Sequence, residues 1–165
     1  EWGFTGGRPQ IDAALFDKTL VCLHQVFKVN LRRVYTTGFS AGALWSTWLL
    51  MHRSDRIAAA ALFSGGVGGI LHYAAPKYDM PVLAVHGGSA DVFGAHLDFS
   101  QMTMELVRAL VTDGHKVIYC DHGGGHRIPF PPSDFALPFL FKQVWGRPTK
   151  GGAVGVHWPQ FCKSG

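Results

Sequence analysis

The chain has 165 residues, of which 47% are hydrophobic and 16% are charged, so it is long enough to bury one substantial core and too apolar to be disordered. The formal net charge is only +4 and the lysines and arginines form no basic block, which argues against a nucleic-acid-binding surface. No apolar run reaches the roughly 18 residues that a bilayer span requires. We therefore expect one domain over residues 1–165, without a membrane span and without a nucleic-acid partner.

The N-terminal part predicts a loop followed by one long helix. Breakers such as Gly3 and Pro9 indicate a loop over the first nine residues. Apolar residues then recur mostly at three- to four-residue steps, which predicts an amphipathic helix over residues 12–29 with Asp12 as a candidate N-cap. Cys22 and His24 lie in this helix and are most simply a packed thiol and a histidine at its rim.

A strand, a sharp turn and a helix are predicted next. Residues 34–37 are β-branched or aromatic, the motif Gly38-Phe39-Ser40-Ala41-Gly42 follows, and residues 43–50 form an apolar run typical of a buried helix. This is the layout of a nucleophile elbow. Gly38 and Gly42 would avoid collisions at the tight turn, Ser40 would project from the top of the sheet, and the N–H of Ala41 would be free to stabilise an oxyanion.

Three further strands are predicted from short apolar runs. Residues 57–64 end in glycines and are typical of a buried parallel strand. A similar run, PVLAVHGG, begins at Pro81, and KVIYC at residues 116–120 predicts the last strand. Strands that alternate with helices and loops predict an α/β fold with a mostly parallel sheet flanked by helices.

The helices of the second half are predicted from periodicity and capping residues. Residues 97–111 should form a helix whose core contacts include Met102 and Leu106. Ser133 or Asp134 could cap a final helix that runs through Trp145. Residues 149–165 are expected to be a loose tail.

Three polar residues each follow the carboxyl end of a predicted strand, where open α/β sheets bind their ligands. They are Ser40, Asp91 and His126. A serine hydroxyl is a weak nucleophile, so it needs a base, and the base histidine needs a carboxylate to fix its tautomer. The order serine, acid, histidine is that of the α/β-hydrolase fold. We therefore predict Ser40 as nucleophile, Asp91 as acid and His126 as base.

Alternatives for these roles stay open. Asp121 is a second candidate for the acid and His122 for the base, whereas His86 is more simply a residue at a strand end. Three other histidines are expected to face solvent, namely His96, His115 and His157. A metal site built from His86, Asp91, His122 and His126 is conceivable but leaves the elbow unexplained, so no metal or cofactor is predicted.

Four blocks of the sequence resemble one group of α/β-hydrolases. They read RRVYTTGFSAGALWSTWLL, DRIAAAALFSGG, PVLAVHGGSADVFG and GGGHRIPFP. In this order and spacing they are similar to the catalytic half of polyhydroxybutyrate depolymerases and feruloyl or acetylxylan esterases, over about residues 12–145. The resemblance implies a secreted or periplasmic serine esterase with Ser40, Asp91 and His126 as its triad. The run Arg127-Ile128-Pro129-Phe130 departs from the aromatic residue that the group often carries soon after the histidine.

The segment before Val34 is too short for the several strands that precede the elbow in a complete α/β-hydrolase. A loop that follows one of those strands supplies the second oxyanion N–H in a complete enzyme. The chain, which starts at Glu1 without an initiator methionine or signal peptide, is therefore expected to be the C-terminal catalytic portion of a longer enzyme, or a trimmed variant without activity. A half-sheet of this kind would leave the elbow strand as an open edge.

The expected activity is ester hydrolysis through an acyl-enzyme, and the resemblance implies polyester, phenolic or acetyl esters as substrates. Candidates for the substrate pocket are Phe39, Phe93, Ile128 and Phe130, while Trp45 is better explained as core. The alternatives are a serine peptidase of the prolyl-oligopeptidase type and an inactive hydrolase remnant that only binds a carbohydrate or a partner. The three cysteines, Cys22, Cys120 and Cys162, leave at least one outside any intramolecular disulfide, and the sequence assigns no oligomeric state.

Overall fold

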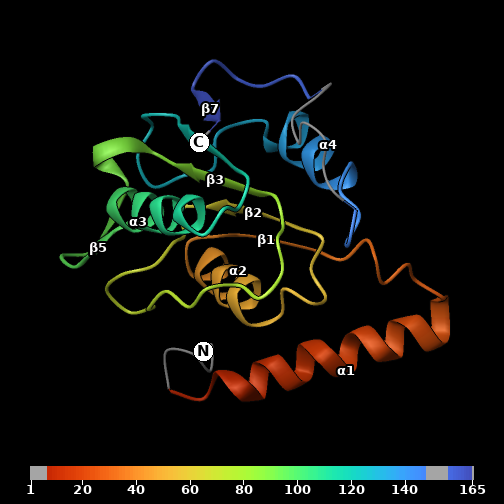
Figure 1. The fold of residues 1–165 in the computed structure, drawn as a ribbon. Coiled ribbons are helices and arrows are strands. Elements are labelled where there is room, and N and C mark those ends of the chain that lie inside the picture. Colours follow the sequence, from red (N-terminus) through yellow and green to blue (C-terminus); the bar gives the residue numbers. More distant parts are fainter. Residues whose placement is uncertain (1–6, 148–155, 165) are drawn as a thin grey trace.

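A five-stranded, mostly parallel β-sheet forms the centre of the protein in this computed structural model, which describes residues 7–147 and 156–164. The strand order is β1-β2-β3-β6-β7; the first four are parallel and β7 is antiparallel to β6 (Figure 1). The predicted α/β fold with a mostly parallel sheet is confirmed. The strands span Tyr35–Phe39 (β1), Ala59–Phe63 (β2), Val82–His86 (β3), Val117–Asp121 (β6) and Cys162–Ser164 (β7).

Helices cover both faces of this sheet. Helices α2 (Ala41–His52) and α3 (Phe99–Thr112) pack on one face and α4 (Ala136–Phe141) on the other; in Figure 1, α2 lies below the strands, α3 at their left and α4 at the upper right. Strands β2 and β3 are buried along their whole length, because both of their faces carry apolar side chains under helices. The smaller elements are two 3-10 turns, Gly88–Ala90 and Pro132–Asp134, and an antiparallel pair of β4 (Val92–Phe93) and β5 (Leu97–Asp98).

The core is divided by the sheet into two main clusters. One cluster joins α2 and α3 to the sheet through residues such as Leu50, Leu62 and Leu106. The other joins α4 to the opposite face through Phe63 and Phe139. The core contacts predicted for Met102 and Leu106 are confirmed, and so is the core position of Trp45, which stacks on Trp48.

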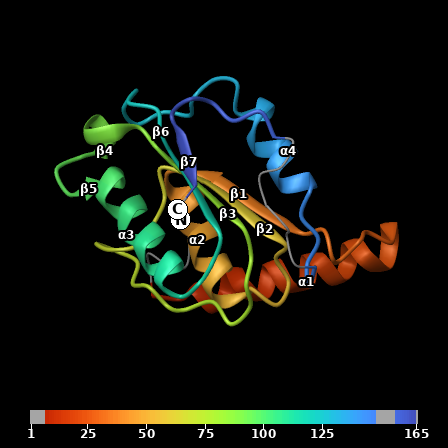
Figure 2. The same cartoon turned by 45° about the horizontal axis from the view of Figure 1, so that its top comes forward.

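The first helix, α1, spans Pro9–Phe27 and lies outside α2, away from the sheet, as both general views show (Figure 2). It starts three residues earlier than predicted, with proline in its first turn, and Asp12 lies inside that turn rather than at the cap. Asp17 anchors α1 to the end of α2, through Arg53 at 3.1 Å and Arg56 at 3.4 Å.

Much of the apolar surface of α1 is exposed in the described part of the chain. Ala13 is its one buried residue, whereas Leu15 is 65% exposed and Phe27 is 71% exposed. The prediction that Cys22 is a packed thiol is wrong for the same reason, because this free cysteine is exposed. Helical periodicity predicted the helix correctly but not the depth at which it packs.

The predicted final helix through Trp145 is wrong in length and in its cap. Helix α4 has six residues and its N-cap is Phe135; Ser133 and Asp134 belong to the preceding 3-10 turn. After α4 the backbone is fixed by the segment that precedes β1, because the N–H of Trp145 donates to the Arg32 carbonyl and the Arg33 guanidinium donates to the Phe141 carbonyl. These long-range bonds replace the helical ones that the capping residues predicted.

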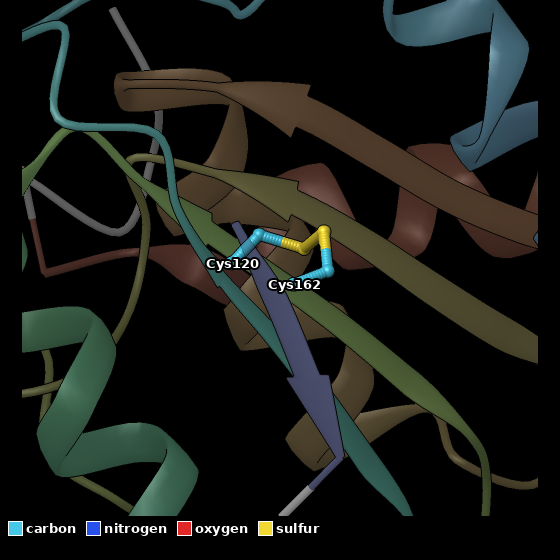
Figure 3. The surroundings of a disulfide bond; sticks show 2 residues. All are labelled: Cys120 and Cys162. Carbon is cyan, nitrogen blue, oxygen red and sulfur yellow. A yellow bond between two sulfur atoms is a disulfide. The ribbon is translucent and has the colours of Figure 1, made fainter. Parts of the chain in front are cut away.

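The expectation of a loose tail over residues 149–165 is wrong for its described part, residues 156–164. This part forms β7 and packs against α4 through Val156 and Trp158. A disulfide joins Cys120 on β6 to Cys162 on β7, which are directly paired across the two strands (Figure 3). Because β7 follows β6 in the chain, the predicted strand KVIYC is not the last strand of the sheet. Residues 149–155 and 165 of the predicted tail lie outside the described residues.

Strand β1 is one edge of the sheet in the described residues, as expected for a sheet that begins at the elbow strand. No helix in this part of the chain has both the length and the apolarity needed to cross a bilayer.

One prediction about the histidines is wrong. His115 is 6% exposed because the turn after α3 folds it inward, while His96 and His157 are exposed as expected.

Candidate active site

The turn between β1 and α2 has the geometry of a nucleophile elbow. Ser40 lies between the two elements with φ 55° and ψ −122°, a backbone conformation that a side chain rarely adopts. A Cβ on Gly38 would collide with the backbone of Gly42 and Ala43, so glycine is required there. The steric role predicted for Gly42 is wrong, because a Cβ there would meet no heavy atom within 4 Å.

Ala41 is the first residue of α2, directly after Ser40. The N–H groups of the first helical turn have no acceptor within their own helix, and the helix dipole adds partial positive charge at this end. The backbone therefore presents a donor and a favourable field beside the Ser40 hydroxyl, which is the environment that a developing oxyanion needs.

His126 is brought to the elbow by the glycine-rich loop that follows β6. The loop runs against the end of β3, where the Gly125 N–H donates to the Gly87 carbonyl at 2.8 Å. A Cβ on Gly87 would collide with the backbone of Gly125, so this close approach depends on glycine. The loop thereby returns over the carboxyl ends of the strands.

Ser40, His126 and Asp91 form one continuous hydrogen-bonded chain. The Ser40 hydroxyl lies 3.0 Å from Nε2 of His126, and Nδ1 of His126 lies 2.7 Å from Oδ1 of Asp91. An ionised carboxylate only accepts, so Nδ1 carries the proton and Nε2 is free to accept the serine proton. The structure thus brings together the three residues that the sequence predicted.

The carboxylate of Asp91 is fully buried and held by two further donors. The Ser64 hydroxyl and the Gly87 N–H each donate to its Oδ2 at 2.8 Å. Oδ1 is thereby left for His126. Sequence reasoning missed Ser64; its position at the carboxyl end of β2, in line with the other polar residues, was the signal that could have identified it.

Aromatic rings surround the imidazole of His126. Phe39 and Phe99 each have ring centroids 4.7 Å from it, and Phe93 has one at 5.8 Å. Phe99 is 1% exposed and Phe93 is 62% exposed, so the histidine lies between a packed interior and an open rim. Such rings limit the motion of the imidazole and exclude water from part of its surface.

The alternative acid and base lie elsewhere. Asp121 accepts from the Gly123 N–H at 2.9 Å and its side chain is half exposed. His122 accepts from the Gly124 N–H through Nδ1, and burial lowers the pKa of His122, which favours the neutral ring that can accept. His86 is buried at the end of β3, where its Nδ1 accepts from the Gly88 N–H. Each of these side chains has a local role in the loops.

A cavity of about 350 Å³ lies beside the elbow, between the open edge of β1 and α4. Two of the residues predicted to bind substrate, Phe39 and Ile128, line it. Phe93 and Phe130 lie outside it, and Phe130 is 95% exposed. The other lining residues are Thr37, Gly38, Phe63, Pro132, Ser133, Ala136, Leu137 and Leu140, so the walls are mostly apolar.

Metal-ligating side chains do not gather at this site. Within residues 7–147 and 156–164, no three of the His, Cys, Asp and Glu side chains are grouped so that they could hold a metal ion. The chemistry that the residues offer is that of an activated hydroxyl, a base and a buried carboxylate.

Comparison with known proteins identifies the fold. No protein-family model matches the chain, and no relative is found among curated protein sequences. Native pOPH superposes with a TM-score of 0.75 at 19% identity over 93% of this chain and 58% of pOPH. The Bacillus cereus carboxylesterase superposes with a TM-score of 0.62 at 19% identity over 77% of this chain and 57% of the esterase.

A thermostable esterase superposes with a TM-score of 0.61 at 22% identity, over 82% of this chain and 38% of that protein. The chain therefore spans less than two thirds of the length of each of these proteins. At such identities the likeness concerns the fold alone. The protein has part of the α/β-hydrolase fold, with its elbow strand at the edge of the sheet.

Proposed function

We propose that this protein is a serine carboxylic-ester hydrolase that works through an acyl-enzyme. The observation that carries the proposal is the chain of hydrogen-bond distances from Ser40 through His126 to Asp91, 3.0 and 2.7 Å, at an elbow with a strained serine. A serine with only a packing role has no need of an imidazole nitrogen at hydrogen-bond distance from its hydroxyl. The esterases with the same fold support the reaction class.

In the proposed reaction, the Ser40 oxygen attacks the ester carbonyl while His126 takes the hydroxyl proton at Nε2. Asp91 stabilises the imidazolium that forms, and the Ala41 N–H donates to the oxyanion. His126 then gives the proton to the alcohol oxygen, which leaves, and Ser40 remains acylated. Water attacks the acyl group with His126 again as base, which releases the acid and restores the serine.

The substrate proposal rests on the surroundings of the triad. Phe39 and Ile128 line the cavity beside the elbow and Phe93 lies beside His126, so these side chains offer apolar and aromatic contacts to the acyl or alcohol group, which suits polyester or plant-wall phenolic and acetyl esters. The resemblance to polyhydroxybutyrate depolymerases and feruloyl or acetylxylan esterases gives the same substrate class. A secreted or periplasmic location is proposed with it, and the Cys120–Cys162 disulfide supports an oxidising compartment.

The test is labelling with a fluorophosphonate probe, followed by peptide mapping and turnover of p-nitrophenyl esters. We expect the label on Ser40 and loss of both labelling and turnover in Ser40→Ala. Ser89→Ala, an exposed serine at the same end of the sheet, should retain both. A folded Ser40→Ala protein that keeps its turnover would rule out this assignment. Aminoacyl nitroanilides in the same assay separate an esterase from a peptidase.

A second candidate function is binding without catalysis. It is favoured by one observation, namely that the chain spans only 58% of the length of pOPH and that the described residues hold no strand ahead of β1 from which a second oxyanion donor could come. Loss of one such donor costs about 2.7–4 kcal/mol of transition-state stabilisation. Failure of the probe to label Ser40 in a protein shown to be folded by circular dichroism would favour this function.

A further inference from the structure

Ser64 stands at the carboxyl end of β2 with a backbone conformation that its residue type disfavours. Its φ is 51°, in the left-handed region, and it is one of three non-glycine residues with positive φ in the described chain, the others being Lys28 and Ser40. Such strain costs of order 1 kcal/mol and persists where the surroundings impose it, often at functional sites. Gly65 and Gly66 follow directly, so glycine is used freely in this turn but not at position 64.

The surroundings show what the serine contributes that glycine could not. The backbone N–H of Ser64 donates to the Val85 carbonyl at 2.8 Å, an interaction that any residue but proline would make. Its hydroxyl donates to Oδ2 of Asp91 at 2.8 Å, and the side chain is 1% exposed. The hydroxyl is therefore a fixed donor in a dry site, aimed at one oxygen of one carboxylate.

That carboxylate oxygen is the one that does not face His126. Oδ2 of Asp91 receives Ser64 and the Gly87 N–H, and Oδ1 faces Nδ1 of His126 at 2.7 Å. Two donors on Oδ2 fix the torsion of the carboxylate and keep its charge in place without competing for the oxygen that faces the histidine. Among the contacts described, Ser64 and the Gly87 N–H are the two donors to Oδ2 of Asp91.

We propose that Ser64 is a positioning residue for the Asp91–His126 pair, and that its hydroxyl is the reason for the strained backbone at this turn. The inference rests on the proposed hydrolase function, since it assigns Ser64 to the same chain of residues. Ser64 touches neither substrate nor the reacting atoms; it acts through Asp91.

The test uses two substitutions that separate the backbone from the hydroxyl. Ser64→Gly removes the hydroxyl and relieves the positive φ, whereas Ser64→Thr keeps a hydroxyl but places a β-branched residue at φ 51°. If the hydroxyl positions Asp91, Ser64→Gly should lose about tenfold or more in kcat with KM unchanged and its Tm kept or raised. Ser64→Thr should keep kcat within about threefold while its Tm falls.

A structural role alone predicts the opposite result, with Ser64→Gly fully active and Ser64→Thr impaired in proportion to its stability. That result would overturn the proposal. Thr103→Val is the matched control: Thr103 is equally buried and its hydroxyl donates to the Gly65 carbonyl at 2.8 Å, away from Asp91, so loss of this hydroxyl should leave kcat unchanged.

A second readout does not depend on turnover. The proton on Nδ1 of His126 should give a downfield NMR resonance in the wild type that persists in Ser64→Thr and is broadened or lost in Ser64→Gly. An unchanged resonance in Ser64→Gly would overturn the inference. If the wild type turns over no ester but the resonance follows this pattern, the proposed hydrolase function fails and the role of Ser64 in the Asp91–His126 pair stands.

Discussion

Phe99 lies stacked against the imidazole of His126, with ring centroids 4.7 Å apart and 15° between the planes. Phe99 is the first residue of α3 and is buried with Leu44 and Met102 in a small cluster beside the site. Because its capping residue Asp98 accepts from the Gln101 N–H at 2.9 Å, the start of α3 is fixed and the ring is presented in one position. The core and the candidate active site therefore share a side chain.

Replacing Phe99 with leucine should affect both stability and turnover. The smaller side chain is expected to lower the free energy of unfolding by about 1 kcal/mol and to reduce ester turnover, because the imidazole loses the flat surface that holds it. Met102→Leu, in the same cluster and without a ring contact to His126, is the control. Urea denaturation and kcat measure the two effects, and an equal loss of kcat in both variants would contradict the positioning role of the ring.

Asp91→Asn should lower kcat by about 10⁴-fold while the protein stays folded. An amide in place of the carboxylate cannot stabilise the imidazolium and favours the wrong tautomer of His126. The matched variant is Asp121→Asn, because the native Asp121 carboxylate accepts from the Gly123 N–H and not from His126. Its kcat should fall by less than about tenfold if Asp91 is the acid. The reverse order of the two losses would transfer the acid role to Asp121.

The disulfide between Cys120 and Cys162 should contribute about 2–4 kcal/mol to the free energy of unfolding, because it closes a segment with a sequence separation of 42. Cys162→Ser should therefore unfold at clearly lower denaturant concentration. Cys22→Ser, which removes the exposed free thiol, should be neutral within about 0.5 kcal/mol. Reduction of the wild type should reproduce the Cys162→Ser result; an unaffected wild type would contradict this contribution.

Stability at alkaline pH should depend on Tyr73. Burial raises the pKa of Tyr73 above its ordinary value near 10, and its hydrogen bond to Asp113 at 2.6 Å adds to the effect. The folded protein keeps this proton when the unfolded chain loses it, so the stabilisation is complete below about pH 10 and declines as the pH rises further. In Tyr73→Phe the decline should be smaller, which denaturation midpoints between about pH 8 and pH 11 can measure. Parallel curves for the two proteins would contradict the prediction.

The sequence predicted the parallel strands and the elbow because their signals are local. Apolar runs that end in glycine identify β2 and β3, and the spacing of Gly38 and Ser40 identifies the turn. Asp91 and His126 could also be predicted as site residues, because each follows a strand and the carboxyl ends of parallel strands lie at one edge of the sheet. Their exact pairing depends on contacts that the sequence alone does not contain.

What sequence reasoning missed depends on segments far apart in the chain. Periodicity cannot reveal that Trp145 is held by Arg32 rather than by a helix, nor that the segment around Cys162 returns to pair with β6. Burial of α1 was overestimated because an amphipathic pattern says which face is apolar and not what covers it. Ser64 was missed because its role follows from its contact with Asp91.

Within residues 7–147 and 156–164, β1 pairs on one side only, so its peptide groups are of two kinds. The Val34 carbonyl and the Ser40 N–H bond to the β2 side, at Ala58 and Phe63, so the even-numbered residues between them face the same way. The N–H groups of the odd-numbered residues, such as Thr37, therefore point outward from the sheet. Amide hydrogen exchange should alternate between slow and fast along this one strand, and any chain that adds to the edge would be detected as protection at the odd positions alone.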